Sequence, residues 1–175
     1  MKRTPLIKFK GNPIKQRIVG KIEGFSQEIV IEPSVLKHIS IYRQVTPWSN
    51  EAGGQLFGYI DGQMICGIEA TGPYSGDERF RHRYRSNSVA AQGAIDNMAQ
   101  KGLLYLGEWH THAEDCPSAS GMDADAMHRL IENSRLNSNS LLLLIVGRAP
   151  SIDGLAVWSV ANKKMHRWKL FEASD

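Results

Sequence analysis

The chain has 175 residues, of which 42% are hydrophobic and 22% are charged, with 21 Lys and Arg against 18 Asp and Glu. This composition suits one domain of about 100–200 residues and excludes a disordered, collagen-like or disulfide-scaffold protein. The net charge of +3 is unevenly spread, because seven cations and one acid give residues 1–24 a charge of +6 and leave −3 for the rest. We therefore expect one domain, residues 1–175, with a basic N-terminal arm at about residues 1–24.

Hydrophobic patterning predicts, in chain order, a strand at 27–32, a helix from Pro33 that ends before Pro47, strands at 56–60, 63–70 and 79–85, a helix at 90–101, a strand at 103–112, a helix at 121–135, and strands at 141–146, 155–160 and 165–171. Asp61-Gly62 is a hairpin turn pair, and the last two strands are expected to pair antiparallel. Strands outnumber helices, and some helices lie between strands. We therefore expect the α/β (α+β) class, with a curved mixed β-sheet flanked by helices.

The sequence contains no pattern typical of a membrane span, a signal peptide or a disulfide framework. No apolar run approaches the roughly 20 residues that a membrane span needs, and no signal-peptide pattern follows the N-terminal Met-Lys-Arg-Thr-Pro. Cys66 and Cys116 form neither a disulfide framework nor a Cys-x-x-Cys zinc pair. We expect a soluble, cytoplasmic protein without a membrane partner.

The segment His110-Thr111-His112 ends the strand predicted at 103–112. Residues two apart on a strand point to the same face, so both imidazoles can converge, while Trp109 faces the core. With Asp123 they would form a small nitrogen and oxygen donor set of the kind that zinc prefers. Ser120 and Asp123 taken alone indicate a helix capping box instead, and both roles could coexist. The spacing of all four residues together favours a metal site.

Glu51 lies just before Gly53-Gly54, which lead into a predicted strand. The two glycines permit a close backbone approach or an unusual turn. An acid before a turn is usually only solvated. Beside a zinc-activated water, however, Glu51 would be suited to act as a general base.

Together, these residues resemble the JAMM motif of the JAB/MPN zinc metalloproteases: a Glu ahead of Gly-Gly, then His-x-His, seven residues, Ser, two residues and Asp. The matching residues are Glu51, His110, His112, Ser120 and Asp123. The run Gly-Glu-Trp-His-Thr-His-Ala-Glu-Asp further resembles bacterial members, including those of CBASS anti-phage operons that lie beside ubiquitin-transfer-like enzymes. The resemblance covers about residues 27–160. It departs from many relatives at Ala113 and Ala119, where they carry Pro.

The resemblance implies an MPN/JAB fold, which is similar to that of cytidine deaminases, and one catalytic zinc ion. His110, His112 and Asp123 would bind the zinc with water in the fourth position, Glu51 would move the proton, and Ser120 would donate a hydrogen bond to the oxyanion. The implied reaction is hydrolysis of a peptide or isopeptide bond after the C-terminal tail of a ubiquitin-like or other conjugated protein, such as a conjugated nucleotidyltransferase. Eukaryotic relatives grip polyubiquitin through insertions for which this chain has little space.

Four arginines alternate in the strand predicted at 79–85, which places Arg79, Arg81, Arg83 and Arg85 on one face. They are candidate substrate-binding residues for an acidic surface or a terminal carboxylate. This strand and the loop after His112 would flank a substrate tail that adds to a sheet edge. The alternative is an edge strand whose charges prevent aggregation.

Three other functions are alternatives to a zinc protease. A catalytically silent MPN scaffold predicts a damaged metal set, whereas every motif position is filled. A cysteine hydrolase would use Cys116, which lacks the helix N-terminus that commonly activates a thiol. Nucleic-acid binding through the basic arm and residues 79–85 is disfavoured as the main role because the rest of the chain is acidic.

Overall fold

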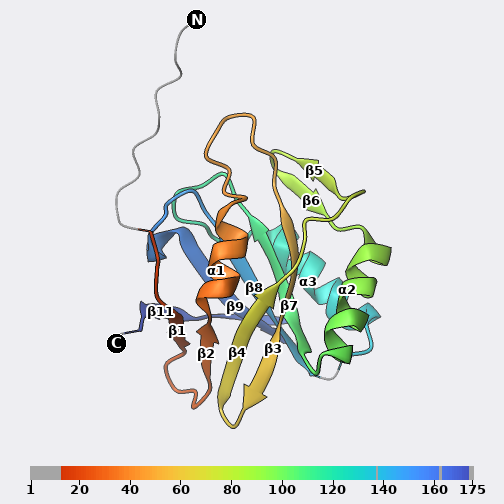
Figure 1. The fold of residues 1–175 in the computed structure, drawn as a ribbon. Helices are drawn as coiled ribbons and strands as arrows, with labels where there is room; N and C mark the ends of the chain where they lie inside the picture. Colours follow the sequence, from red (N-terminus) through yellow and green to blue (C-terminus); the bar gives the residue numbers. More distant parts are fainter. Residues whose placement is uncertain (1–12, 137, 162, 174–175) are drawn as a thin grey trace, which may run out of the picture.

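The computed structural model describes residues 13–136, 138–161 and 163–173 (Figure 1). The elements are β1 (Ile18–Lys21), β2 (Glu28–Ile31), α1 (Pro33–Ser40), β3 (Gly53–Asp61), β4 (Met64–Ala70), β5 (Glu78–Phe80), β6 (Arg83–Arg85), α2 (Ser88–Gln100), β7 (Leu104–Thr111), α3 (Gly121–Asn133), β8 (Ser140–Val146), a short 3-10 helix η1 (Ile152–Gly154), β9 (Leu155–Ala161), β10 (Lys164–Arg167) and β11 (Lys169–Glu172). Within the described residues, none of the helices combines the length and apolar character needed to cross a membrane.

One large mixed sheet runs in the order β10-β9-β8-β7-β3-β4-β2-β1-β11. The pairs β2–β4 and β7–β8 are parallel, and the other neighbours are antiparallel. The two edge strands, β10 and β11, are separated in the chain only by the buried Trp168. The sheet therefore curves until it is nearly closed, which confirms the expected curved mixed sheet.

The strand β8 is buried on both faces of the sheet, which explains its continuous apolar sequence. Leu142, Leu144 and Val146 join the core cluster that includes α1. Their neighbours on the opposite face pack with Met127 of α3. In Figure 1, α1 covers one face of the sheet and α3 lies on the other, and α2 contacts β3 and β7.

Three parts of the predicted architecture differ in the structure. Residues 79–85 form a hairpin of β5 and β6 with Arg81-His82 at the turn, so the four arginines do not share one strand face. Period-two alternation cannot distinguish one strand from a tight hairpin that lacks Gly, Pro or Asn at its turn. Residues 165–171 are divided at Trp168, because β10 pairs with β9 while β11 pairs with β1.

The third difference lies in the segment expected as a basic arm. Residues 18–21 form β1 inside the sheet, where Ile18 is fully buried. Residues 1–12 of the expected arm lie outside the described residues. The other predicted strands and helices are present, with ends that differ by a few residues.

Gly107 on β7 should be intolerant of a side chain. The register of β3 and β7 shifts beside it, its φ is +150°, and an added Cβ would lie 1.9 Å from the carbonyl oxygen of Leu142. Gly107→Ala is therefore expected to lower the free energy of unfolding by about 3 kcal/mol or more. Urea denaturation measures this, with Gly93→Ala as the control because the space around Gly93 on α2 is open. An equal loss in both variants would contradict the expectation.

Candidate active site

His110 of β7, His112 directly after β7 and one carboxylate of α3 converge at one point. The Nε2 atoms of His110 and His112 lie 3.1 Å apart. His110 Nε2 is 3.1 Å from Asp123 Oδ1, and His112 Nε2 is 3.5 Å from Asp123 Oδ2. One ligand atom from each of the three residues lies within 4.8 Å of the others. Two imidazoles and a carboxylate are a donor set that fits zinc, so these side chains could hold a metal ion.

Strand alternation produces this convergence. Trp109 and Thr111 are fully buried on the opposite face of β7, as the spacing predicted for Trp109. The side chains of His110 and His112 remain 13% and 14% exposed, so they are partly accessible to solvent. The cluster therefore lies at a partly exposed end of β7.

Ser120 and Asp123 begin α3, and Asp123 also belongs to the cluster with the two histidines. Ser120 is the N-cap, its hydroxyl accepts from the Asp123 amide, and a full capping box is present. The Ser120 amide and hydroxyl donate to Asp123 Oδ2 at 2.6 and 2.7 Å, while Asp123 Oδ1 faces His110. Because Asp123 Oδ1 faces His110 and takes no part in the Ser120 contacts, capping and metal binding do not exclude each other.

The carboxylate of Asp123 and the imidazole of His112 stabilise each other's charged forms, which shifts the pKa values of both. Burial alone would raise the pKa of Asp123, but hydrogen bonds from His110, His112 and Ser120 outweigh it and hold that pKa well below its usual range. Burial alone would likewise lower the pKa of His112, but Asp123 reverses this and raises it. Asp123 is therefore ionised at neutral pH, the state in which it can ligate a metal.

Glu51 lies beside this cluster, on the segment that leads into β3. The residue is 8% exposed, and its carboxylate interacts electrostatically with His112 and Asp123. Burial is the largest cause of a raised pKa at Glu51; His112 opposes it and Asp123 adds to it, and together they place the pKa at about 7. A carboxyl group with a pKa near neutrality can accept a proton and return it during a reaction. Glu51 is therefore buried near the cluster rather than being a solvated acid.

The Gly53-Gly54 pair allows the start of β3 to pack closely against the backbone on both sides. Neither glycine needs a left-handed backbone, but a Cβ at Gly53 would lie 2.6 Å from the Trp109 carbonyl oxygen. A Cβ at Gly54 would lie 1.8 Å from the Thr71 carbonyl oxygen. Of the two roles that the sequence left open for this pair, close backbone approach is the correct one.

The four arginines differ in their contacts. Arg79 donates through Nε to the Glu51 carbonyl at 2.8 Å, and Arg81 donates to the carbonyls of Thr46 and Pro47. Arg83 lies 3.7 Å from Glu78 and is largely exposed, as is Arg85. The structure therefore brings Arg79 to the backbone of Glu51, whereas Arg83 and Arg85 face solvent.

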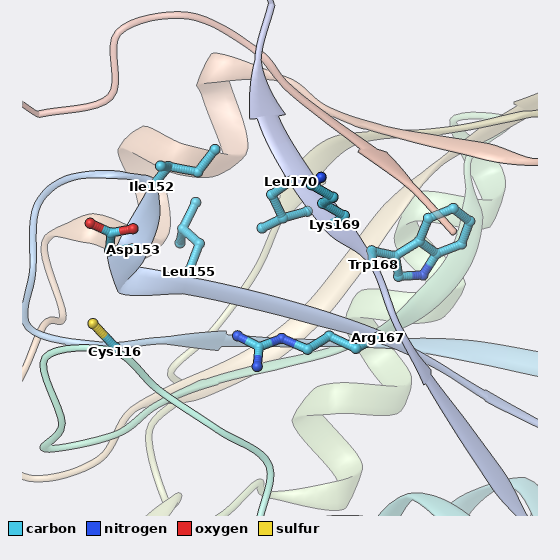
Figure 2. A pocket seen from close by; sticks show the side chains of 8 residues that line it. All are labelled: Cys116, Ile152, Asp153, Leu155, Arg167, Trp168, Lys169 and Leu170. Carbon is cyan, nitrogen blue, oxygen red and sulfur yellow. The ribbon is translucent and has the colours of Figure 1, made fainter. Parts of the chain in front are cut away.

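Cys116 lines a separate pocket of about 460 Å³, which Figure 2 shows together with the other side chains around it. The other lining residues are Ile152, Asp153, Leu155, Trp168, Lys169 and Leu170. This lining contains no histidine to activate the thiol.

We expect Cys116→Ala to keep full activity in a conjugate-cleavage assay. A loss of activity would favour a cysteine hydrolase that uses Cys116.

Two buried polar residues at the site were not identified from the sequence. Thr111 is fully buried and Gln44 is 1% exposed, and they are hydrogen-bonded to each other. Thr111 could have been found as the middle residue of His-x-His, which alternation sends to the core. Gln44 lies in a loop, and nothing in its sequence context indicates burial.

The fold and this site define the class of the protein. The chain belongs to the family Prok-JAB, the prokaryotic homologues of the JAB domain, whose model matches residues 34–170. That match contains all five residues of the motif, and the predicted resemblance to JAB/MPN proteins is confirmed.

Curated relatives of the chain carry names that are more specific than the family name, because they state an activity. The chain is 37% identical over 123 residues to the CD-NTase/cGAS isopeptidase of Vibrio cholerae, with 69% of this chain and 76% of the relative covered. It is 32% identical over 130 residues to a protein of the same name from Escherichia coli, with 73% and 81% covered. A solution structure of a Desulfitobacterium hafniense protein matches with a TM-score of 0.57 at 20% identity, covering 78% of this chain and 87% of that one, and shows the shared fold.

Proposed function

We propose that this chain is a zinc-dependent isopeptidase that acts in a bacterial anti-phage defence system. Its substrate would be a conjugated protein, and it would hydrolyse the amide bond between that protein's C-terminal tail and a target amine. The main support is the convergence of His110, His112 and Asp123 beside the buried Glu51. Because the relatives are named CD-NTase/cGAS isopeptidases, we propose a conjugated CD-NTase as the protein released.

His110, His112 and Asp123 would hold the zinc ion. When bound there, zinc supplies Lewis acidity that polarises a carbonyl group and lowers the pKa of water. Glu51 takes a proton from the attacking water, whose oxygen forms a bond to the carbonyl carbon. As the carbon–nitrogen bond breaks, Glu51 returns the proton to the leaving amine.

Ser120 would stabilise the negative charge that develops on the carbonyl oxygen. Its hydroxyl is placed at the N-terminus of α3 and donates to Asp123 in the present conformation. During the reaction the same hydrogen would turn to the substrate oxygen. Loss of such a donor typically costs about 3–4 kcal/mol of transition-state stabilisation.

Exposed apolar side chains occur on the segments that carry or contact the site residues. Trp48 is 76% exposed and lies three residues before Glu51, Phe80 accepts from the Glu51 amide through its carbonyl, and Met122 precedes Asp123. Such side chains are candidates for contact with a protein substrate.

Trp48→Ala is expected to raise KM about fivefold and leave kcat nearly unchanged, because an exposed aromatic anchor typically contributes at least about 1 kcal/mol to binding. Steady-state kinetics on a conjugate measure both constants. Phe25→Ala is a suitable control, since Phe25 is also exposed but lies in the turn between β1 and β2, at the end of the sheet away from β5 and β6 (Figure 1). An unchanged KM for Trp48→Ala would remove this residue from the substrate surface.

The hairpin arginines remain candidates for substrate contact. We propose that Arg83 and Arg85, which are exposed, meet an acidic surface or carboxylate of the substrate. Arg79 and Arg81 already donate to backbone carbonyls and serve the hairpin itself.

The proposed function is tested with a CD-NTase whose C-terminus is joined to a lysine side chain of a second protein. Mass spectrometry should show the CD-NTase released with an intact C-terminus and the lysine amine restored. A conjugate that persists, or a cut elsewhere in either protein, would contradict the proposal. Binding without cleavage would favour the silent scaffold.

A further inference from the structure

The backbone of Glu51 and Ala52 is held at all four of its polar groups. The Glu51 amide donates to the Phe80 carbonyl at 2.8 Å, and the Glu51 carbonyl accepts from Arg79 Nε at 2.8 Å. The Ala52 amide donates to the hydroxyl of Thr111 at 3.0 Å, and the Ala52 carbonyl accepts from the Thr111 amide at 2.8 Å. The hairpin thus fixes Glu51, and Thr111 alone fixes both groups of Ala52.

Thr111 connects this segment to a buried glutamine. Its hydroxyl also donates to Gln44 Oε1 at 3.3 Å. Gln44 Nε2 in turn donates to the carbonyls of Ser49 at 3.1 Å and Arg81 at 2.8 Å. Gln44 and Thr111 are 1% and 0% exposed, so these hydrogen bonds are shielded from water. A buried polar network whose groups are paired makes its surroundings rigid and specifies one arrangement.

We propose that Thr111 and Gln44 are positioning residues for Glu51. Thr111 is the last residue of β7 and lies between His110 and His112 in the chain, so a bond from its hydroxyl to Ala52 ties the base directly to the segment that carries both imidazoles. Gln44 keeps that hydroxyl oriented and joins it to the β5–β6 hairpin through Arg81. Displacement of a reacting group by about 1 Å can cost about 100-fold in rate, which is the error that this network prevents.

The inference rests on the proposed isopeptidase function and is tested by a matched pair at one position. Thr111→Val removes the hydroxyl and keeps the shape of the side chain, whereas Thr111→Ser keeps the hydroxyl. Thr111→Val should lower kcat about tenfold or more, with KM and bound zinc unchanged, because only the placement of the base is altered. Thr111→Ser should retain kcat to within about threefold.

Hydrogen exchange supplies a readout that does not depend on activity. In Thr111→Val, the Ala52 amide loses its acceptor, so deuterium uptake by a peptide covering residues 49–54 should rise, while Thr111→Ser should match the wild type. Gln44→Met provides a second variant if Thr111→Val does not fold, and it should lower kcat in the same way.

The outcomes separate this inference from the proposed function. A wild-type protein that cleaves no conjugate would contradict the proposed function. An active wild type with normal kcat in both Thr111→Val and Gln44→Met would overturn the positioning role alone. Equal losses in Thr111→Val and Thr111→Ser would also overturn it, because the hydroxyl would then not be the cause.

Discussion

Glu51→Gln is expected to retain the fold and the metal but to lower kcat by about 10²–10⁴-fold, the usual contribution of a general base. Glutamine has nearly the same shape as glutamate and cannot take a proton from water. The fold should tolerate it, because burial already raises the pKa of Glu51 to about 7 and so disfavours the ionised form. Thermal unfolding should therefore occur at the same or a slightly higher temperature.

The measurement combines kcat on an isopeptide conjugate with metal content by elemental analysis. Glu69→Gln is the matched control, because Glu69 is exposed on β4. The control should have wild-type kcat and zinc. Near-normal turnover by Glu51→Gln would remove Glu51 as the base.

Glu51 should also determine how kcat/KM falls as the pH is lowered. Glu51 must be ionised to accept a proton, so kcat/KM should fall as the pH is lowered through the pKa of this group. That pKa is about 7 without metal, and a nearby cation favours the ionised form and lowers it. The wild type should therefore lose activity at or below about pH 7, and the residual activity of Glu51→Gln should lack this step.

Asp123→Asn is expected to lower zinc affinity by more than about 100-fold and to remove measurable turnover at low zinc concentration. Loss of a partner that only orients a metal ligand costs about 10–100-fold, and removal of a charged ligand should cost more. Asparagine keeps an oxygen that can accept from the Ser120 amide, so α3 should remain capped. The effect is therefore on the metal rather than on the helix.

Competition with a zinc-sensitive dye measures the affinity, and circular dichroism checks α3. Asp125→Asn is the control, because Asp125 is exposed on the same helix two residues further on. Wild-type zinc affinity in Asp123→Asn would exclude this carboxylate as a ligand.

Much of the site could be predicted from the sequence because its residues follow local periodicities. Strand alternation placed His110 of β7 and His112, which directly follows β7, on one side and Trp109 on the other. The Ser-x-x-Asp spacing placed Ser120 and Asp123 at the start of α3. Residues fixed by a spacing of two along a strand, or of three at a helix N-terminus, need no tertiary information.

The parts that could not be predicted depend on contacts between distant segments. The turn inside 79–85 was missed because alternation continues through it, and the hairpin is anchored by Arg79 on Glu51 and by Arg81 on the loop before it. The division at Trp168 follows from the curvature of the whole sheet. Gln44 is buried only because Thr111 and the hairpin cover it, and no local pattern encodes that.

The most direct test of the central claim is a zinc titration of the metal-free protein, followed by the rate of isopeptide cleavage. His110, His112 and Asp123 form one cluster among the described residues, so activity should be absent without zinc, rise in proportion to the zinc added and stop rising at about one ion per chain. Full activity of a protein shown to contain no metal would contradict the account.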